Sequence, residues 1–566
     1  MTDVRVYLCR CFSEVDRTVD LERIQERLLQ NASVASSTIV DSLCLDSDIQ
    51  RVAAEIKESG AERVVIAACS TMGRGDSVIE GLAEEGVDRF AIHLIDIREG
   101  CAWIHQDEPE GATFKAWNLI DMGVSLVAKK DRSDDVTIRV RPEVLIIGAG
   151  PAGLAAAVMV AKLGYTVHCL DRAAHPGGML RFISRSYPND EDAVLKLAPY
   201  LDEIHNNARI AFYPQARVET VTGFAGNFTV RFSSGGQERW IRPGAIIIAT
   251  GAMVYLPHGL YRYGETQNII TQMELERRLQ SESDSIQNAV FVQCVGARIP
   301  ERPYCSTICC PASIKNAMRI VEKNPDARVS IVHRDIMMPG SILEDYYRRA
   351  MLQGVQFVRY RDDMLPAIKG YEQVRAVEVH DSITGTTRVL DADLVVLSTP
   401  LVPNPDNRYL ADMLGLQCDR YGFFREIYPL HPLETRMEGI FICGSARWPV
   451  SSDQAIVQGE AAAMKVISLL GKGEVAASSF SRVPGQKFGH ATVNPDRCTG
   501  CGNCVAVCPF DACTLQEIEE KYTYISRVNK MRCKACGNCV AVCLNGAMQV
   551  PEHNYRAVVE MIKRAF

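Results

Sequence analysis

The chain has 566 residues, a mass of 62.6 kDa, a formal net charge of −7 and a pI near 6.0. Its composition is 47% hydrophobic and 23% charged, which is ordinary for a globular protein, and its length predicts roughly three or four domains. The acidic balance excludes a general electrostatic attraction to nucleic acid or to anionic membranes. The sequence has no uncharged apolar run long enough to span a bilayer and no signal-peptide core, so we expect a cytoplasmic protein.

Cysteine is the unusual feature of this composition. Disulfides are disfavoured in a reducing compartment, so 21 cysteines predict metal ligation or catalysis. Sixteen of them fall into groups with the spacing of metal ligands. The other five are Cys101, Cys169, Cys418, Cys443 and Cys513.

Residues 1–140 have the pattern of an α/β unit with cysteines after its strands. Strand-like segments at 4–8, 37–40 and 63–68 precede the four cysteines Cys9, Cys11, Cys44 and Cys69. If the strands are parallel, these thiols gather at the carboxyl edge of one sheet, where α/β proteins bind ligands. The pattern predicts a metal site, with buried core thiols as the alternative. Cys101 follows a fourth candidate strand, 90–95, and competes for a ligand position.

The segment 144–171, VLIIGAGPAGLAAAVMVAKLGYTVHCLD, is a strand, a glycine turn, a helix and a second strand. Gly148 and Gly150 permit a tight turn close to a pyrophosphate, and Gly153 lets the helix pack on the strand. Asp171 falls about 20 residues on, where a ribose hydroxyl needs an acceptor. The segment therefore predicts a dinucleotide site, and Gly177-Gly178 fit a backbone that passes close to the cofactor.

Two later segments, AIIIATG at 245–251 and GIFICG at 439–444, complete a pattern that resembles flavoproteins of the thioredoxin reductase type. The resemblance implies FAD along the first of two dinucleotide domains. Ser445 stands where that family usually has an aspartate, so its contact to the ribityl chain is missing. The candidate FAD-binding residues are Gly148, Gly150, Pro151, Ala152, Gly153, Asp171, Arg172, Gly177, Gly178, Thr250, Gly251, Gly444, Gln454 and Ala455.

The second dinucleotide domain begins as a strand near Ala289 but lacks the glycine signature for a nicotinamide cofactor. Thiols replace that loop, and a helix is expected from Pro311. Adjacent cysteines cannot form an ordinary zinc pair, and strain disfavours a disulfide between them. The pattern predicts an unusual iron–sulfur cluster on Cys294, Cys305, Cys309 and Cys310.

The carboxyl-terminal cysteines form an internal duplication, with CGNCVAVC at both 501 and 536. The spacing is that of bacterial two-cluster ferredoxins, in which three cysteines of one run and the fourth of the other hold each [4Fe–4S] cube. One cube is predicted on Cys498, Cys501, Cys504 and Cys543, and the other on Cys533, Cys536, Cys539 and Cys508. Paired zinc sites, the alternative, fit three-plus-one runs poorly. Leu544 replaces the second proline, and Cys513 is interpreted as a small buried residue.

These motifs together resemble the heterodisulfide reductase A family of iron–sulfur flavoproteins over nearly the whole chain. The stretches that carry the resemblance are VYLCRC at 6–11, CLDSDIQ at 44–50, RVVIAACS at 63–70, DIREG at 96–100, QCVGAR at 293–298, YCSTICCPASIK at 304–315 and the ferredoxin module. The family implies a [4Fe–4S] cluster on the four amino-terminal cysteines and an irregularly ligated one on Cys294 to Cys310. It also implies that Lys315 lies near the flavin, where a cation favours a reduced, anionic ring. Sequence alone favours a solvated helix lysine there.

The predicted fold is a thioredoxin-reductase-like, two-dinucleotide-domain α/β flavoprotein with an amino-terminal α/β iron–sulfur domain and a carboxyl-terminal α+β 2[4Fe–4S] ferredoxin domain. Full-length family members carry a further ferredoxin insert in the flavin domain, whereas this chain has no cysteine between Arg181 and the next helix. The predicted limits are 1–140, 141–268, 269–390, 391–473, a linker at 474–490 and 491–566.

The resemblance implies an electron-transfer subunit of an anaerobic oxidoreductase, relaying electrons between FAD and clusters. Electron bifurcation, the family's best-known activity, is left open because the insert is missing. Implied partners are heterodisulfide reductase B/C-like subunits, hydrogenase, formate or NADH dehydrogenase-type modules, ferredoxin and a second copy of the chain. Two alternatives remain: a self-sufficient NAD(P)H-dependent reductase resembling the glutamate synthase small subunit, and a non-enzymatic ferredoxin-like carrier.

Overall fold

The computed structural model describes residues 3–131, 136–280, 286–427, 431–476, 489–518, 523–551 and 554–565. The chain divides into two compact units, one made of Met1–Ile138 with Val475–Phe566 and the other of Arg139–Glu474. Most of the expected linker, 477–488, lies outside the described residues, and the domain limits within each unit stay predictions. None of the helices in the described ranges has both the length and the apolar character that a membrane span requires.

The amino-terminal part of the first unit is a four-stranded sheet in the order β2-β1-β3-β4, and every neighbouring pair is parallel. The strands are β1 (Val4–Cys9), β2 (Val34–Val40), β3 (Val64–Ala68) and β4 (Ile92–Asp96). Their helices are α1 (Leu21–Leu28), α2 (Asp46–Ser59), α3 (Gly75–Glu84) and α4 (Pro109–Lys129). Asp20 caps α1 by accepting from the Arg23 N–H, and Gly60 ends α2 with φ +62°. The strands therefore have the parallel arrangement on which the expected gathering of the cysteines depends.

The ferredoxin part of this unit repeats one small motif. In each half a glycine with positive φ, Gly502 or Gly537, begins a short helix that carries a buried cysteine. The helices are α12 (Asn503–Val507) and α13 (Asn538–Ala541), and the strands are β27 (Thr492–Val493), β28 (Cys513–Ile518), β29 (Thr523–Val528) and β30 (Met548–Gln549). β28 pairs with β29 and β27 with β30, both antiparallel.

The last helix, α14 (Tyr555–Ala565), packs against α4 of the amino-terminal part. Asn554 donates from Nδ2 to the Lys129 main-chain oxygen at 3.1 Å, and the Asp131 N–H donates to the Pro551 oxygen at 3.0 Å. The carboxyl-terminal helix therefore packs on the amino-terminal domain within one compact unit.

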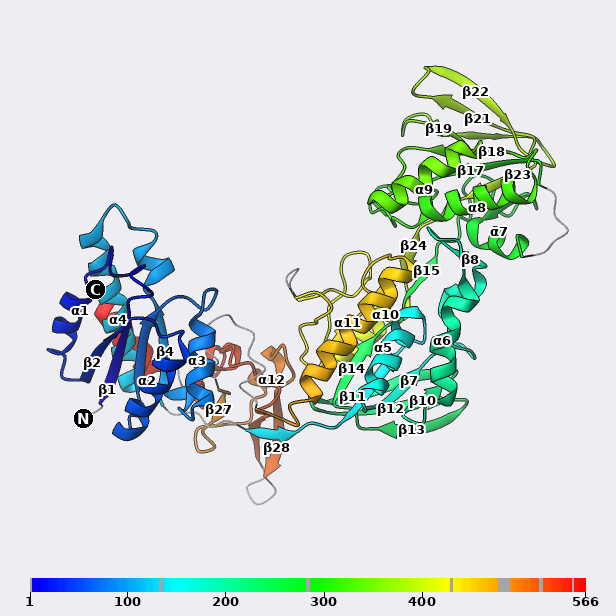
Figure 1. Cartoon of the computed structure of the whole chain (residues 1–566). Helices are drawn as coiled ribbons and strands as arrows, with labels where there is room; N and C mark the ends of the chain where they lie inside the picture. Colours follow the sequence, from blue (N-terminus) through cyan, green and yellow to red (C-terminus); the bar gives the residue numbers. More distant parts are fainter. Residues whose placement is uncertain are drawn as a thin grey trace. The chain divides into compact units, whose positions relative to one another are not determined.

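In the second unit a five-stranded parallel sheet in the order β10-β7-β6-β14-β25 carries the glycine motif (Figure 1). Its strands are β6 (Glu143–Ile147), β7 (Thr166–Leu170), β10 (Ile210–Tyr213), β14 (Ala245–Ile248) and β25 (Ile440–Ile442). Helices α5 (Pro151–Lys162), α6 (Ala193–Asn206) and α11 (Ser452–Leu470) lie side by side. The antiparallel sheet of β11 (Ala216–Phe224), β12 (Asn227–Ser234) and β13 (Gln237–Ile241) shares a core with the main sheet, into which Phe232 and Ile246 pack.

A second parallel sheet, in the order β16-β23-β17-β18-β19, follows in the same unit. Its strands are β16 (Ile269–Thr271), β17 (Asn288–Val292), β18 (Arg328–His333), β19 (Gln356–Arg359) and β23 (Leu394–Leu397). One core joins it to helices α7 (Gln272–Arg278), α8 (Cys309–Lys323) and α9 (Ser341–Leu352). Another joins it to the antiparallel sheet of β20 (Ala367–Lys369), β21 (Ala376–Asp381) and β22 (Thr386–Asp391). Helix α8 begins at Cys309, two residues before the position expected, because Pro311 is tolerated within the first turn.

Helix α5 is held between two close glycine contacts. A Cβ at Gly153 would lie 1.8 Å from the Gly148 main-chain oxygen, and a Cβ at Gly459 on α11 would lie 2.0 Å from the Ala152 main-chain oxygen. Neither backbone atom can move aside as a flexible side chain would. The turn after β6, helix α5 and helix α11 thus form one closely packed stack.

We expect the Gly459→Ala variant to lose about 1–3 kcal/mol of unfolding free energy, because the added methyl group overpacks the contact between α11 and α5. Urea unfolding of the holoprotein, monitored through the release of flavin, measures the change in unfolding free energy. Val457→Ala on the same helix is the control, since Val457 is 62% exposed and its truncation is expected to be nearly neutral. Equal midpoints for wild type and Gly459→Ala would contradict the role given to this contact.

Candidate functional site

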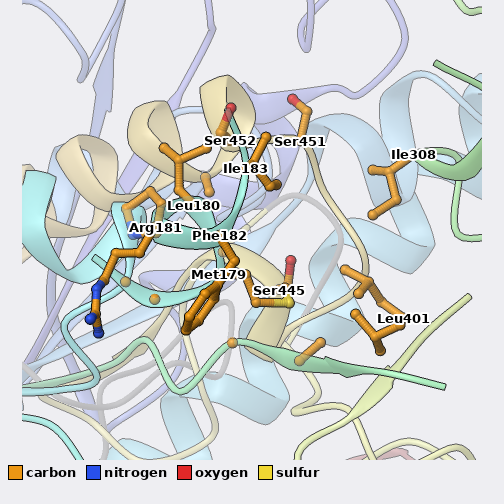
Figure 2. A pocket seen from close by; sticks show the side chains of 18 of the residues that line it. Met179, Leu180, Arg181, Phe182, Ile183, Ile308, Leu401, Ser445, Ser451 and Ser452 are labelled. Carbon is orange, nitrogen blue, oxygen red and sulfur yellow. The ribbon is translucent and has the colours of Figure 1, made fainter. Parts of the chain in front are cut away.

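A pocket of about 390 Å³ lies in the second unit beside the glycine turn. Its walls come from the turns after β6 and β7, the start of α11, helix α7 and the first turns of α8. Figure 2 shows Met179 to Ile183 on one side of this pocket and Ile308 with Leu401 on the other. The volume and the mixed lining are typical of a cofactor site.

The glycine turn after β6 fits a dinucleotide. Gly148 has φ +109°, and a Cβ there would lie 2.3 Å from the Ala249 main-chain oxygen, so only glycine is accommodated. Gly150 has open space around its Cα and is the N-cap of α5, whose first-turn N–H groups are available to an anion. The backbone can therefore approach a pyrophosphate closely.

Asp171 lies at the pocket wall after β7, and main-chain donors hold its carboxylate. Oδ2 accepts from the Ala149 N–H at 2.6 Å and Oδ1 from the Ala173 N–H at 2.7 Å. Each oxygen retains acceptor capacity, so the carboxylate can still accept a hydrogen bond from a ribose hydroxyl. Arg172 also lines the pocket and donates to Asn404 Oδ1 at 3.2 Å.

The structure brings most of the candidate FAD residues to this one pocket: Gly148, Gly150, Pro151, Ala152, Asp171, Arg172, Gly178, Thr250, Gly251, Gly444 and Ala455. Gly153, Gly177 and Gln454 are not among its lining residues. Gly153 serves the packing of α5, and the Gly177 N–H donates to the Ala149 oxygen at 2.7 Å. Gln454 closes a capping box with Ser451 at the start of α11, a role that the pattern Ser-x-x-Gln already indicates in the sequence.

Lys315 lines the same pocket and is 2% exposed, so the alternative of a solvated helix lysine is wrong. It forms an ion pair with Glu276, whose side chain is 5% exposed, and donates from Nζ to the Arg185 main-chain oxygen at 2.9 Å. Burial lowers the pKa of Lys315, and the carboxylate of Glu276 opposes that shift. The pair places a proton and a compensated positive charge at the pocket wall.

Three of the four cysteines after β17, Cys294, Cys309 and Cys310, have raised pKa values. Burial is the largest cause for Cys294, Cys309 and Cys310, and it raises the pKa of Cys310 to about 12. The neighbouring thiols, including Cys305, add to the effect because adjacent thiolates repel one another. Four neighbouring thiols, of which Cys310 is buried and the other three are half-buried, fit a metal cluster, whose cations compensate the negative charge that burial disfavours.

Cys309 also belongs to the wall of the large pocket, and its sulfur faces the Thr399 main-chain oxygen at 3.3 Å. Gln272, another lining residue, donates from Nε2 to the Cys309 oxygen at 3.0 Å. The cysteine group and the flavin pocket therefore share a residue.

At the carboxyl edge of the amino-terminal sheet, three of the four predicted cysteines are in direct contact. Cys11 lies 3.4 Å from Cys9 between sulfurs, and it also donates to Cys69, whose pKa is lowered to about 6 chiefly by that hydrogen bond. The Leu43 N–H donates to the Cys9 sulfur at 3.4 Å, and the adjacent Cys44 contacts Ser42 Oγ at 3.3 Å. Cys101, the competing candidate, faces the Asp96 main-chain oxygen at 3.9 Å instead of a thiol.

The ferredoxin cysteines line two separate cavities. Cys498, Cys501, Cys504 and Cys543 line one of about 280 Å³, which has room for a polynuclear cluster. Cys508, Cys533, Cys536 and Cys539 line a smaller one of about 10 Å³, together with Cys513. Nowhere in the described ranges do three His, Cys, Asp or Glu side chains converge as the ligands of a single metal ion do. Three cysteines of one run with the fourth of the other are the donor set of ferredoxin clusters.

Sequence reasoning misses several residues of the site. Glu276 is on a helix rich in charged residues, and no sequence signal separates it from a surface glutamate. Cys513 is 4% exposed, as its interpretation as a small buried residue predicts, but the sequence does not predict its hydrogen bond with Cys539. The duplication could have indicated that Cys513 belongs to the repeated motif. Cys513 follows Cys508 by the same interval as Met548 follows Cys543.

The parallel sheets, the glycine turn and the cysteine-lined cavities define an iron–sulfur flavoprotein. Residues 142–298 match the pyridine nucleotide-disulphide oxidoreductase family, and residues 461–512 and 497–547 match the 4Fe-4S dicluster domain. The chain belongs to the family of A-type iron–sulfur subunits of CoB–CoM heterodisulfide reductase. It is an oxidoreductase whose cofactors are FAD and [4Fe–4S] clusters, which confirms the predicted fold class and cofactors.

The relatives match almost end to end. The first of two A-type iron–sulfur subunits of CoB–CoM heterodisulfide reductase from Methanopyrus kandleri is 30% identical over 92% of this chain and 91% of its own length. The A-type subunit from Methanocaldococcus jannaschii is 29% identical over 99% and 98%, and that of the H(2)/formate:CoB–CoM heterodisulfide,ferredoxin reductase from Methanococcus maripaludis is 28% identical over 91% of each. The alignment with the M. kandleri protein spans 625 positions, so that relative has segments which this 566-residue chain lacks.

Among solved structures, thioredoxin reductases of T. acidophilum and Lactococcus lactis are similar to this chain. The first is 17% identical with a TM-score of 0.41, over 58% of this chain and 98% of its own. The second is 18% identical with a TM-score of 0.42, over 58% and 99%.

We expect Glu276→Leu to cost about 3–5 kcal/mol of unfolding free energy, because it leaves the Lys315 ammonium buried without its partner. The double variant Glu276→Leu/Lys315→Met removes both charges and should recover much of that loss. Urea unfolding of wild type, Glu276→Leu, Lys315→Met and the double variant gives the coupling energy of the pair. Additive losses, with no recovery in the double variant, would contradict the assignment of a strong buried pair.

Proposed function

We propose that this chain is the electron-relay subunit of a larger oxidoreductase, with FAD in the pocket beside Gly148 and four clusters on the sixteen grouped cysteines. The observation that carries the proposal is the presence of Cys309 in the wall of the flavin pocket. A residue common to both sites gives the shortest protein path between a flavin and a cluster. When bound, FAD exchanges electrons in pairs or singly and each cluster carries one at a time.

The residues around the pocket have separate parts in this function. The turn at Gly148 and the carboxylate of Asp171 hold the dinucleotide, and Leu180, Phe182 and Ile183 contribute apolar walls that limit water. Lys315 holds its proton and charge at the wall through Glu276. A buried cation there favours negative charge on whatever ring the pocket binds.

The amino-terminal and ferredoxin cysteines lie in one compact unit, which we propose connects the flavin unit to partner subunits. Cys501 and Cys536 are exposed, so a cluster held there lies near the protein surface and is accessible to a partner. The relatives are named as subunits of heterodisulfide reductases, and some of these names include ferredoxin or H(2)/formate. We propose partners of these kinds, together with a second copy of this chain, and a location in the cytoplasm, where 21 free cysteines stay reduced.

The second sheet does not support the alternative of a self-sufficient NAD(P)H reductase. The residue after Gln293 is Cys294 with φ +62°, and the Cβ position of Gly296 lies 2.3 Å from the Tyr255 ring, which leaves no open loop for phosphates. Asp335, which follows β18, forms ion pairs with Arg298 at 3.0 Å and Arg359 at 2.8 Å, so its charge is already compensated within the chain. Electrons therefore enter from a partner, and the chain need not bind a nicotinamide cofactor.

The test of this function is a cofactor analysis of anaerobically purified full-length protein. We expect about one FAD and roughly sixteen irons per chain, with paramagnetic signals after dithionite reduction. We expect NADH and NADPH to leave the flavin absorbance unchanged without partners. Rapid bleaching by either nucleotide would favour the self-sufficient reductase, and protein without flavin would favour the simple carrier.

Ligand and non-ligand cysteines of the ferredoxin part should differ in iron content. Cys539→Ala is expected to lower the iron content by up to about four atoms per chain, because it removes a cluster ligand. Cys513→Ala is the matched control, since Cys513 is similarly buried and contacts Cys539, yet lies outside the predicted ligand set. Iron and sulfide analysis checks both variants, and an equal loss in Cys513→Ala would contradict the ligand assignment.

A further inference from the structure

The side chain of Gln293 is buried against the cysteine group without full hydrogen bonding. Gln293 directly follows β17 and is 1% exposed. Its Oε1 faces the Cys310 sulfur at 3.9 Å, and its Nε2 has no hydrogen-bond partner among the described residues. A buried amide N–H without an acceptor is destabilising, so this donor is available to a new acceptor beside it.

The protonation state of Cys310 decides which end of the amide faces it. As a thiol, Cys310 donates its S–H to Oε1. A cysteine that ligates iron is a thiolate, which has no proton and only accepts. Oε1 would then face a negatively charged sulfur, which is unfavourable. Rotation of the terminal amide by half a turn exchanges Oε1 for Nε2, and this rotation satisfies both the thiolate and the unpartnered donor.

The backbone holds Gln293 firmly enough for that contact to be specific. Its N–H donates to the Val332 oxygen at 2.9 Å, and its carbonyl accepts from the Tyr360 hydroxyl at 3.0 Å. Tyr360 is 2% exposed, so water does not compete at this place. A donor fixed in a dry site interacts more strongly with charge than one in water.

We propose that Gln293 is a positioning residue for the cluster on Cys294, Cys305, Cys309 and Cys310, and that its Nε2–H donates to the Cys310 thiolate and makes this cluster easier to reduce. The inference rests on the proposed function, which assigns a cluster to these cysteines. Reduction adds negative charge to the cluster and its sulfurs, so a hydrogen-bond donor stabilises the reduced form more than the oxidised form.

The test is a redox titration of the anaerobic full-length holoprotein. The paramagnetic resonance signal of this cluster is monitored at each potential. For Gln293→Leu we expect the equilibrium to shift roughly tenfold toward the oxidised cluster, which is about 59 mV for a one-electron couple. Gln293→Glu keeps the shape but replaces the N–H donor with an acceptor, and its potential should fall at least as far. If Gln293→Leu fails to fold or loses iron, Gln293→Glu carries the test.

Tyr360→Phe is the matched control, because it removes the hydrogen bond to the Gln293 main chain and leaves the amide donor in place. Because the Val332 oxygen still holds the Gln293 N–H, we expect a much smaller fall in potential than in Gln293→Leu. An unchanged potential in a fully iron-loaded Gln293 variant would overturn the inference, and so would an equal shift in Tyr360→Phe, which would indicate a loosened loop. The Cys310→Ala variant tests the cluster assignment itself. If every paramagnetic signal of the wild type persists in Cys310→Ala, the cluster assignment of the proposed function fails instead.

Discussion

The close approach of helix α5 to the turn after β6 is the contact on which the flavin unit depends. Gly153 brings the helix against the Gly148 carbonyl, and Gly459 brings α11 against the Ala152 carbonyl in the first turn of the same helix. Because neither contact leaves room for a Cβ, the position of the α5 amino end is closely fixed. The anion-binding N–H groups, Asp171 and the start of α11 are all held in place by this one packing arrangement.

The second constraint is electrostatic and concerns burial of ionisable groups. The cysteines after β17 are held in surroundings that disfavour thiolates, and Lys315 is held in surroundings that disfavour an ammonium ion. Each group is costly unless a partner compensates it, namely iron for the thiolates and Glu276 for the lysine. Cys309 and Lys315 both line the flavin pocket, so both costly groups lie at this site.

The sequence allowed the architecture to be predicted where short-range rules apply. The glycine turn, the parallel strands that end at cysteines and the duplicated ferredoxin motif depend on local spacing, which the chain displays directly. The Lys315 pair could not be predicted in this way, because Glu276 is 39 residues earlier and looks like any surface acid. The hydrogen bond of Cys513 and the buried amide of Gln293 likewise depend on tertiary packing, and the start of α8 differs because a proline within the first turn permits an earlier helix.

The first and last residues of the flavin unit, Arg139–Glu474, lie close together. The Val140 N–H donates to the Gly473 oxygen at 2.8 Å, so the two termini of this unit are neighbours, and the remaining sequence on either side belongs to one compact body. Such an arrangement is that of a domain inserted into a host protein. The unit with the amino-terminal and ferredoxin cysteines is thus interrupted once in the sequence by the flavin unit, and each of the two units keeps hydrophobic cores of its own.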